Sequence, residues 1–151
     1  MRLPILCALA VTVSWTMTSG PSLAVDSSQS SDAVDLTSVR QKIKAKNWQA
    51  AIEELKPIVA RINDADAFNL YAFSLRNAGD HRSAFTYYGK ALDFDPNHKS
   101  AREYLGELYV ITGDMAKAHQ QLTMLEKFCP SGCEELDDLR KAVAAGPPKT
   151  N

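Results

Sequence analysis

Apolar residues recur at spacings of three and four from about Leu36 to Ala145, and no segment in this range alternates as a half-buried strand would. The spacing predicts helices throughout and therefore an all-α fold. Residues 25–35, "VDSSQSSDAVD", contain few large apolar side chains, so burial would not offset the entropy of ordering them. We expect a flexible leader there. Gly146 and the two prolines after it would end the last helix and leave residues 146–151 as a disordered tail.

A repeat of 34 residues organises the helical region. The matched positions are Tyr71-Ala72 with Leu105-Gly106, Leu75 with Tyr109, Gly79-Asp80 with Gly113-Asp114, Ala84 with Ala118, Tyr88 with Leu122 and Pro96 with Pro130. A fainter copy precedes these at an offset of 33, with Ala51 and Leu55 at the positions of Ala84 and Tyr88. Two copies in register and a partial third predict a stack of similar supersecondary units.

This pattern resembles the tetratricopeptide repeat, a helix–turn–helix unit of 34 residues. The resemblance implies a solenoid domain over residues 36–145, with repeats at about 32–64, 65–98 and 99–132 and a C-terminal capping helix at 132–145. Ala72, Gly106, Ala84 and Ala118 would lie where helices approach closely. Gly79 and Gly113 would take the left-handed conformation that ends the first helix of each pair. The first repeat departs from the family pattern, as terminal repeats often do.

The family's fold also implies a concave groove, lined by the first helix of each repeat, that binds a protein or peptide partner. The candidate groove residues of this sequence are Asp66, Asn69, Phe73, Arg76, Ser100, Glu103, Glu107 and Val110. Phe73 is either an aromatic anchor for the partner or a residue packed against the neighbouring repeat. Because Glu103 and Glu107 would repel an acidic segment, a basic or neutral partner segment fits better.

The segment "SGCEELDDLRKAVAA" follows Pro130 and predicts the capping helix. Ser131 and Glu134 have the spacing of a capping box. Leu136, Leu139 and Val143 form an apolar stripe that would cover the last repeat. Four acids in the first two turns suit the helix dipole, and we interpret them as a solvated helix start rather than a cation site.

The N-terminus reads as a secretory signal peptide over residues 1–24. Arg2 precedes an apolar run to about Met17, and small residues follow at Ser22 and Ala24. The run is too short and too rich in hydroxyls for a membrane anchor, so we expect no stable span after cleavage. The protein would then be periplasmic. It resembles small periplasmic tetratricopeptide proteins of Gram-negative bacteria, whose tails have a similar cysteine pair leading into "CEEL".

Cleavage would leave two cysteines, Cys129 and Cys133. In an oxidising compartment an even count favours a disulfide, which would fix the angle of the capping helix. Two alternatives stay open. A cysteine at a helix N-terminus has a lowered pKa, so the pair could be a reactive dithiol of an envelope thiol-disulfide protein. Two thiolates could also hold copper, although no methionine cluster supports such a site, and a zinc site would want four ligands.

Composition and motifs narrow the function further. The chain has 17 basic and 18 acidic side chains, and loss of Arg2 with the signal peptide would leave a formal charge of about −2. This balance does not favour nucleic acid or an anionic membrane as a partner. No phosphate loop, nucleophile elbow or metal-binding helix is present in the sequence. We therefore predict a binding module that is not an enzyme and uses no cofactor or metal.

Overall fold

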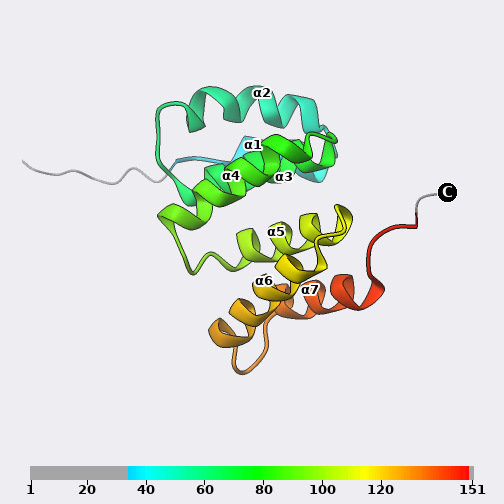
Figure 1. The fold of residues 1–151 in the computed structure, drawn as a ribbon. Coiled ribbons are helices and arrows are strands. Elements are labelled where there is room, and N and C mark those ends of the chain that lie inside the picture. The colour runs from blue at the N-terminus through cyan, green and yellow to red at the C-terminus, as the bar shows by residue number, and fades with distance from the viewer. Residues whose placement is uncertain (1–33, 150–151) are drawn as a thin grey trace, which may run out of the picture. The chain divides into compact units, whose positions relative to one another are not determined.

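The computed structural model describes residues 34–149; the predicted signal peptide and leader lie outside this range except for Val34 and Asp35. Every regular element in the described range is a helix (Figure 1). The helices are α1 (Thr37–Lys44), α2 (Trp48–Val59), α3 (Ala65–Asn77), α4 (His81–Phe94), α5 (Lys99–Ile111), α6 (Met115–Phe128) and α7 (Glu134–Ala145). The predicted all-α fold is confirmed. None of these helices is long and apolar enough to cross a membrane.

The helices form successive antiparallel pairs: α1 with α2, α3 with α4, and α5 with α6. The first helices of the pairs also lie against one another, α1 against α3 and α3 against α5. Helix α7 packs on α5 and α6, in the place that a fourth repeat would occupy (Figure 1). This is the predicted solenoid of three repeats with a capping helix.

The turn inside each repeat uses one backbone geometry three times. Gly79 and Gly113 have φ angles of 90° and 82°, in the left-handed region that glycine adopts without a steric penalty. The aspartate after each glycine caps the next helix; Asp80, for example, accepts a hydrogen bond from the Ser83 amide at 3.0 Å. The first repeat makes the same turn with Lys46, at φ 57°. Lys46 precedes Gly79 by 33 residues. The residue that the first repeat lacks relative to the 34-residue unit is therefore missing after this turn.

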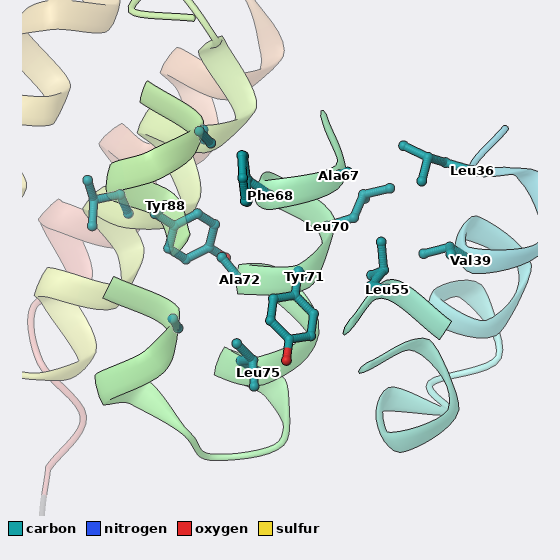
Figure 2. Close-up of a cluster of buried hydrophobic side chains, with 14 of the residues drawn as sticks. Leu36, Val39, Leu55, Ala67, Phe68, Leu70, Tyr71, Ala72, Leu75 and Tyr88 are labelled. Atoms are coloured by element: carbon teal, nitrogen blue, oxygen red, sulfur yellow. The ribbon is translucent and has the colours of Figure 1, made fainter. Parts of the chain in front are cut away.

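A continuous core of small and large side chains lies between the helices of the first two repeats and α5. Ala72 and Ala84 are fully buried at the predicted close approaches. Tyr88, also fully buried, lies in the same core as Ala72 (Figure 2). Leu36 and Val39 extend this core into α1. A second cluster joins α6 to α7 and contains Leu136 and Leu139, with Val143 packed at its edge. The predicted apolar stripe of the capping helix is thus confirmed.

The start of α7 differs from the sequence prediction. The helix begins at Glu134 with Cys133 as its N-cap residue, and no side chain caps it. Gly132 has a φ angle of 88°, which turns the chain between Ser131 and the helix. Ser131 consequently lies outside the first turn, and the predicted capping box is wrong.

Candidate functional site

The surface formed by α3, α5 and α7, which we call the groove, carries three cavities. The first, of about 440 Å³, lies at the C-terminal ends of these helices and is lined by Arg76, Asn77, Glu107, Val110, Ile111, Ala142, Ala145, Gly146 and Pro148. A second, of about 540 Å³, lies at their N-terminal ends and includes Asp66, His98, Lys99 and Ser100. A third, of about 160 Å³, lies between α5 and the first turns of α7. The first is mainly apolar, and the other two are polar.

Six of the eight predicted groove residues line one of these cavities. They are Asp66, Arg76, Ser100, Glu103, Glu107 and Val110. Asn69 and Phe73 do not. Asn69 is buried, and its side-chain oxygen has no hydrogen-bond partner among the described residues.

Phe73 packs between neighbouring repeats while staying partly exposed. Its ring centroid lies 5.9 Å from that of Trp48 on α2 and 4.7 Å from that of Tyr104 on α5. The guanidinium of Arg76 lies 5.2 Å from the Phe73 ring centroid. These contacts give Phe73 a packing role, and any part in partner binding stays a prediction.

Arg76 and Glu107 form an ion pair across the groove floor, from α3 to α5. Arg76 Nη1 lies 2.5 Å from Glu107 Oε2, and the arginine side chain is only 11% exposed. The guanidinium also lies 5.3 Å from the centroid of the Tyr104 ring. The pair stands beside Val110 and Ile111, so the apolar cavity has one fixed polar wall.

A second polar network joins α1, α3 and α5 at the other end of the groove. The Asp66 carboxylate lies 3.0 Å from Arg40 Nη2 and 3.0 Å from His98 Nε2. His98 is the N-cap of α5, and its Nδ1 accepts a hydrogen bond from the Ala101 amide. Because Nδ1 is an acceptor, the ring proton is on Nε2, which donates to Asp66.

Glu103 is the most unusual group in the groove. It is 7% exposed, and its carboxylate has no hydrogen-bond or ion-pair partner among residues 34–149. Burial raises its pKa to about 8, with further contributions from the nearby carboxylates of Glu107, Asp138 and Glu135. Arg76 opposes this shift only in part.

Several groove residues were not predicted. Tyr104, Glu134, Glu135 and Asp138 surround Glu103 in the smallest cavity, and Ile111 lines the apolar cavity. The position of Ile111 follows from the repeat, since it is the residue after Val110 on the same turn. The proximity of the α7 acids to Glu103 depends on how the capping helix docks, which no local pattern encodes.

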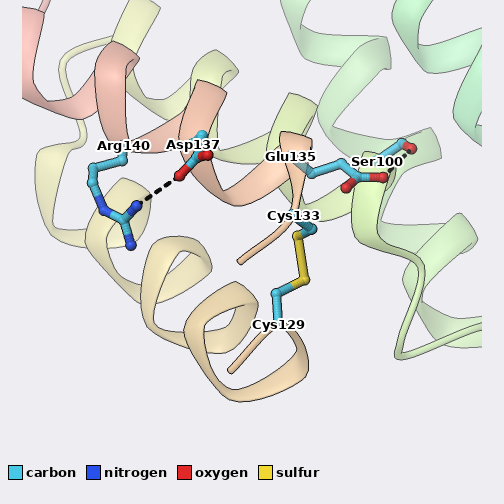
Figure 3. Close-up of a disulfide and its surroundings, with 6 residues drawn as sticks. All are labelled: Ser100, Cys129, Cys133, Glu135, Asp137 and Arg140. Carbon is cyan, nitrogen blue, oxygen red and sulfur yellow. Dashed lines mark hydrogen bonds and ion pairs between the residues drawn. A yellow bond between two sulfur atoms is a disulfide. The ribbon is translucent and has the colours of Figure 1, made fainter. Parts of the chain in front are cut away.

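The structure brings the two cysteines together at the junction of α6 and α7. Their Cα atoms are 5.8 Å apart and their sulfur atoms adjoin (Figure 3). This separation lies within the range that disulfides span. Cys129 is buried and Cys133 is partly exposed. No group of three or more histidine, cysteine or acidic residues in the described part of the chain could hold a metal ion.

Comparison with solved structures shows the tetratricopeptide-repeat fold. A yeast Sti1 structure, "TPR2AB-domain:pHSP90-complex", matches 72% of this chain with a TM-score of 0.64 and 18% identity. The Yersinia enterocolitica type III secretion translocator chaperone SycD matches 72% of this chain and 78% of its own, with a TM-score of 0.65 and 14% identity. PcrH in complex with the chaperone binding region of PopD has a TM-score of 0.63 and 15% identity over 72% of this chain and 83% of its own.

The likeness is one of fold alone. This chain spans 44% of the Sti1 TPR2AB structure, so that protein extends well beyond the shared region. No protein-family model and no curated protein matches the sequence.

Proposed function

With the tetratricopeptide-repeat fold as premise, we propose that this protein is an exported, non-enzymatic module that binds an extended peptide segment of a protein partner in its groove. The single observation that carries the proposal is the apolar cavity at the C-terminal ends of α3, α5 and α7. It is open at the surface, mainly apolar, and bounded by one fixed ion pair, Arg76 with Glu107. Peptide and ligand sites generally combine an apolar lining with a few placed polar groups.

Two further points support the proposal. Among the similar structures, PcrH is described in complex with a region of PopD, and SycD in complex with a peptide of the translocator YopD. Export to the periplasm rests on residues 1–24, whose basic, apolar and small residues follow the order of a cleaved signal. N-terminal sequencing of the exported protein tests the cleavage of this signal peptide. We expect the mature chain to begin within a few residues of Val25.

The groove is best tested at Ile111, which lines the apolar cavity and is 40% exposed. Ile111→Glu places a charge in the apolar cavity without removing a buried side chain. Ile62 is the matched control, because it is an isoleucine of similar exposure, 44%, and lines none of the groove cavities. Phe73 is less suitable, since its truncation would also remove contacts to Trp48 and Tyr104.

The experiment selects peptides from a random display library on the immobilised mature protein and measures their affinity by fluorescence anisotropy. We expect Ile111→Glu to weaken binding about tenfold or more, a loss typical of a disrupted anchor pocket, and Ile62→Glu to leave it unchanged. Equal affinities for the wild type and both variants would contradict the groove as the binding site.

The cysteine pair is proposed to be a structural disulfide that holds α7 against α6. One observation favours the second candidate function, a thiol-disulfide or copper-handling protein. Cys133 is the N-cap of α7, where the helix dipole stabilises a thiolate. Thiol counting by intact mass on envelope-purified protein separates the two. A structural bond leaves no free thiol, whereas a working dithiol exchanges readily with glutathione.

A further inference from the structure

The smallest groove cavity is built from acidic side chains. It lies where α5 meets the first two turns of α7 and has a volume of about 160 Å³. Its lining residues are Ser100, Glu103, Tyr104, Glu134, Glu135 and Asp138. Since a water molecule occupies about 30 Å³ of liquid, the space suits the end of one long side chain rather than a folded segment.

Two of the four acids in this cavity have partners, and Glu103, the buried one, does not. Glu135 accepts a hydrogen bond from Ser100 at 3.4 Å, and Asp138 is paired with Lys141 at 2.8 Å. Glu103 is more than nine-tenths buried, lines the cavity and makes no polar contact with any described side chain. Because no described side chain satisfies the Glu103 carboxyl, its hydrogen-bond partner must enter the cavity from outside, as water or as a donor group of a bound molecule.

We propose that this cavity receives the basic side chain, arginine or lysine, of the peptide bound in the groove, with Glu103 at its floor as the principal partner. This inference rests on the proposed function, peptide binding in the groove, and adds that the bound peptide carries a positive charge.

The arrangement favours such a side chain over a metal ion. The described residues offer no group of carboxylates close enough together to coordinate a metal. The acids instead line a space in which a guanidinium with five donors, or an ammonium with three, can reach more than one of them. Tyr104 adds an aromatic wall against which the stem of a long side chain can pack.

The electrostatics of the cavity also favour a bound cation. Burial and the surrounding carboxylates raise the pKa of Glu103 to about 8. A cation in the cavity would supply the missing counter-charge, and Glu103 would then release its proton and form a charge-assisted hydrogen bond.

The test uses four short capped probe peptides with leucines flanking one variable central residue. The central residue is arginine or its neutral isostere citrulline, and lysine or its neutral acetylated form. Affinities for the mature protein are measured by titration with ¹H–¹⁵N NMR detection, at a pH above the Glu103 pKa. We expect each charged probe to bind about tenfold or more tightly than its neutral partner, the size of one charge-assisted hydrogen bond. The shifted amides should include Glu103 and Glu135.

Glu103→Gln, which keeps the shape of the side chain, should abolish most of this charge preference. Glu53→Gln, an exposed glutamate on α2 outside the groove, should preserve it. Charged and neutral probes that bind equally, or a preference that survives Glu103→Gln, would overturn the inference. If all four probes bind with equal affinity and lose affinity with Ile111→Glu, peptide binding in the groove stands and the charge preference fails. If no probe binds, both the charge preference and peptide binding in the groove fail.

Discussion

Leu139 of the capping helix fills the space that Gly106 leaves open by having no side chain. A Cβ atom on Gly106 would lie 2.6 Å from both terminal methyl carbons of Leu139, closer than carbon atoms can approach. Leu139 is fully buried. The repeat's preference for a small residue at this position therefore sets how closely α7 docks on α5.

Gly106→Ala should destabilise the protein by about 1 kcal/mol, because overpacking costs about 1–3 kcal/mol and a gain of up to about 1 kcal/mol in helix propensity offsets part of it. In a Leu139→Ala background the same change should be neutral or stabilising, since the obstructing side chain is gone. Urea unfolding of the four proteins in this cycle measures the coupling. Additive effects would show that the contact does not limit docking.

Lys46→Gly should stabilise the protein by up to about 1 kcal/mol, because a non-glycine residue at a left-handed φ pays a steric penalty. Gly79 and Gly113 occupy the same place in the other two repeats. Lys44→Gly is the control, since Lys44 is helical and the change should cost about 1 kcal/mol. The thermal midpoint should rise with Lys46→Gly and fall with Lys44→Gly. A lower midpoint in both variants would contradict a steric penalty at Lys46.

Tyr88→Phe should raise the free energy of unfolding by about 1 kcal/mol. The Tyr88 hydroxyl is fully buried and has no hydrogen-bond partner among the described residues, so its removal ends an uncompensated desolvation cost. Tyr87 is only partly buried, and Tyr87→Phe should change stability little. Denaturant melts of both variants test this, and destabilisation by Tyr88→Phe would show that the hydroxyl has a partner in solution.

Stability should fall as the pH rises from about 4.5 to about 8, over the interval between the ordinary pKa of Glu103 and its raised value in the fold. In this interval the folded state binds a proton that the unfolded state releases, so raising the pH favours unfolding. The groups that face Glu103 are Arg76 on α3, Tyr88 on α4, Tyr104 and Glu107 on α5, and Glu135 and Asp138 on α7. Glu103→Gln should remove most of this dependence.

At pH 9, Glu103→Gln should be more stable than the wild type by roughly 1–2 kcal/mol after allowance for solvent screening. At pH 5 the two proteins should unfold at nearly the same urea concentration, because the amide resembles the protonated carboxyl. A difference of the same size at both pH values would mean that Glu103 does not titrate in this interval.

Replacing Cys129 and Cys133 together by serine should cost about 2 kcal/mol or less, because a bond across so short a loop removes little entropy from the unfolded chain. Hydrogen exchange should quicken in α7, whereas peptide binding at the Ile111 end of the groove should persist. Protection in α7 that is unchanged after replacement would argue against a structural role for the pair.

The sequence was sufficient to predict the features that recur in every repeat. The left-handed turns at Gly79 and Gly113 and the small residues at Ala72 and Ala84 follow from local chemistry that the 34-residue register places in space. The stripe on α7 follows from helical spacing alone. These features depend on short-range geometry and on contacts between equivalent positions.

Other features depend on tertiary placement that one sequence does not encode. The periodicity placed Glu103 on the groove face but could not show that α7 would cover it with further acids. Ser131 satisfied a local capping pattern, yet the turn at Gly132 separates it from the helix. The left-handed turn at Lys46 was not predicted, because the other two repeats have glycine at this position.

Asp66 connects three successive first helices through a single carboxylate, which bonds to Arg40 on α1 and to His98 at the start of α5. In a stack of repeats each unit normally interacts only with its neighbours, so small hinge motions at successive junctions add independently along the superhelix. We expect bending at the first junction to displace the same Asp66 carboxylate that contacts His98 at the second junction. Both Arg40 and Asp66 are largely exposed, so this tether adds little stability. We infer that the Asp66 carboxylate weakly couples bending at the first junction between repeats to bending at the second, along the edge that carries Arg40 and His98.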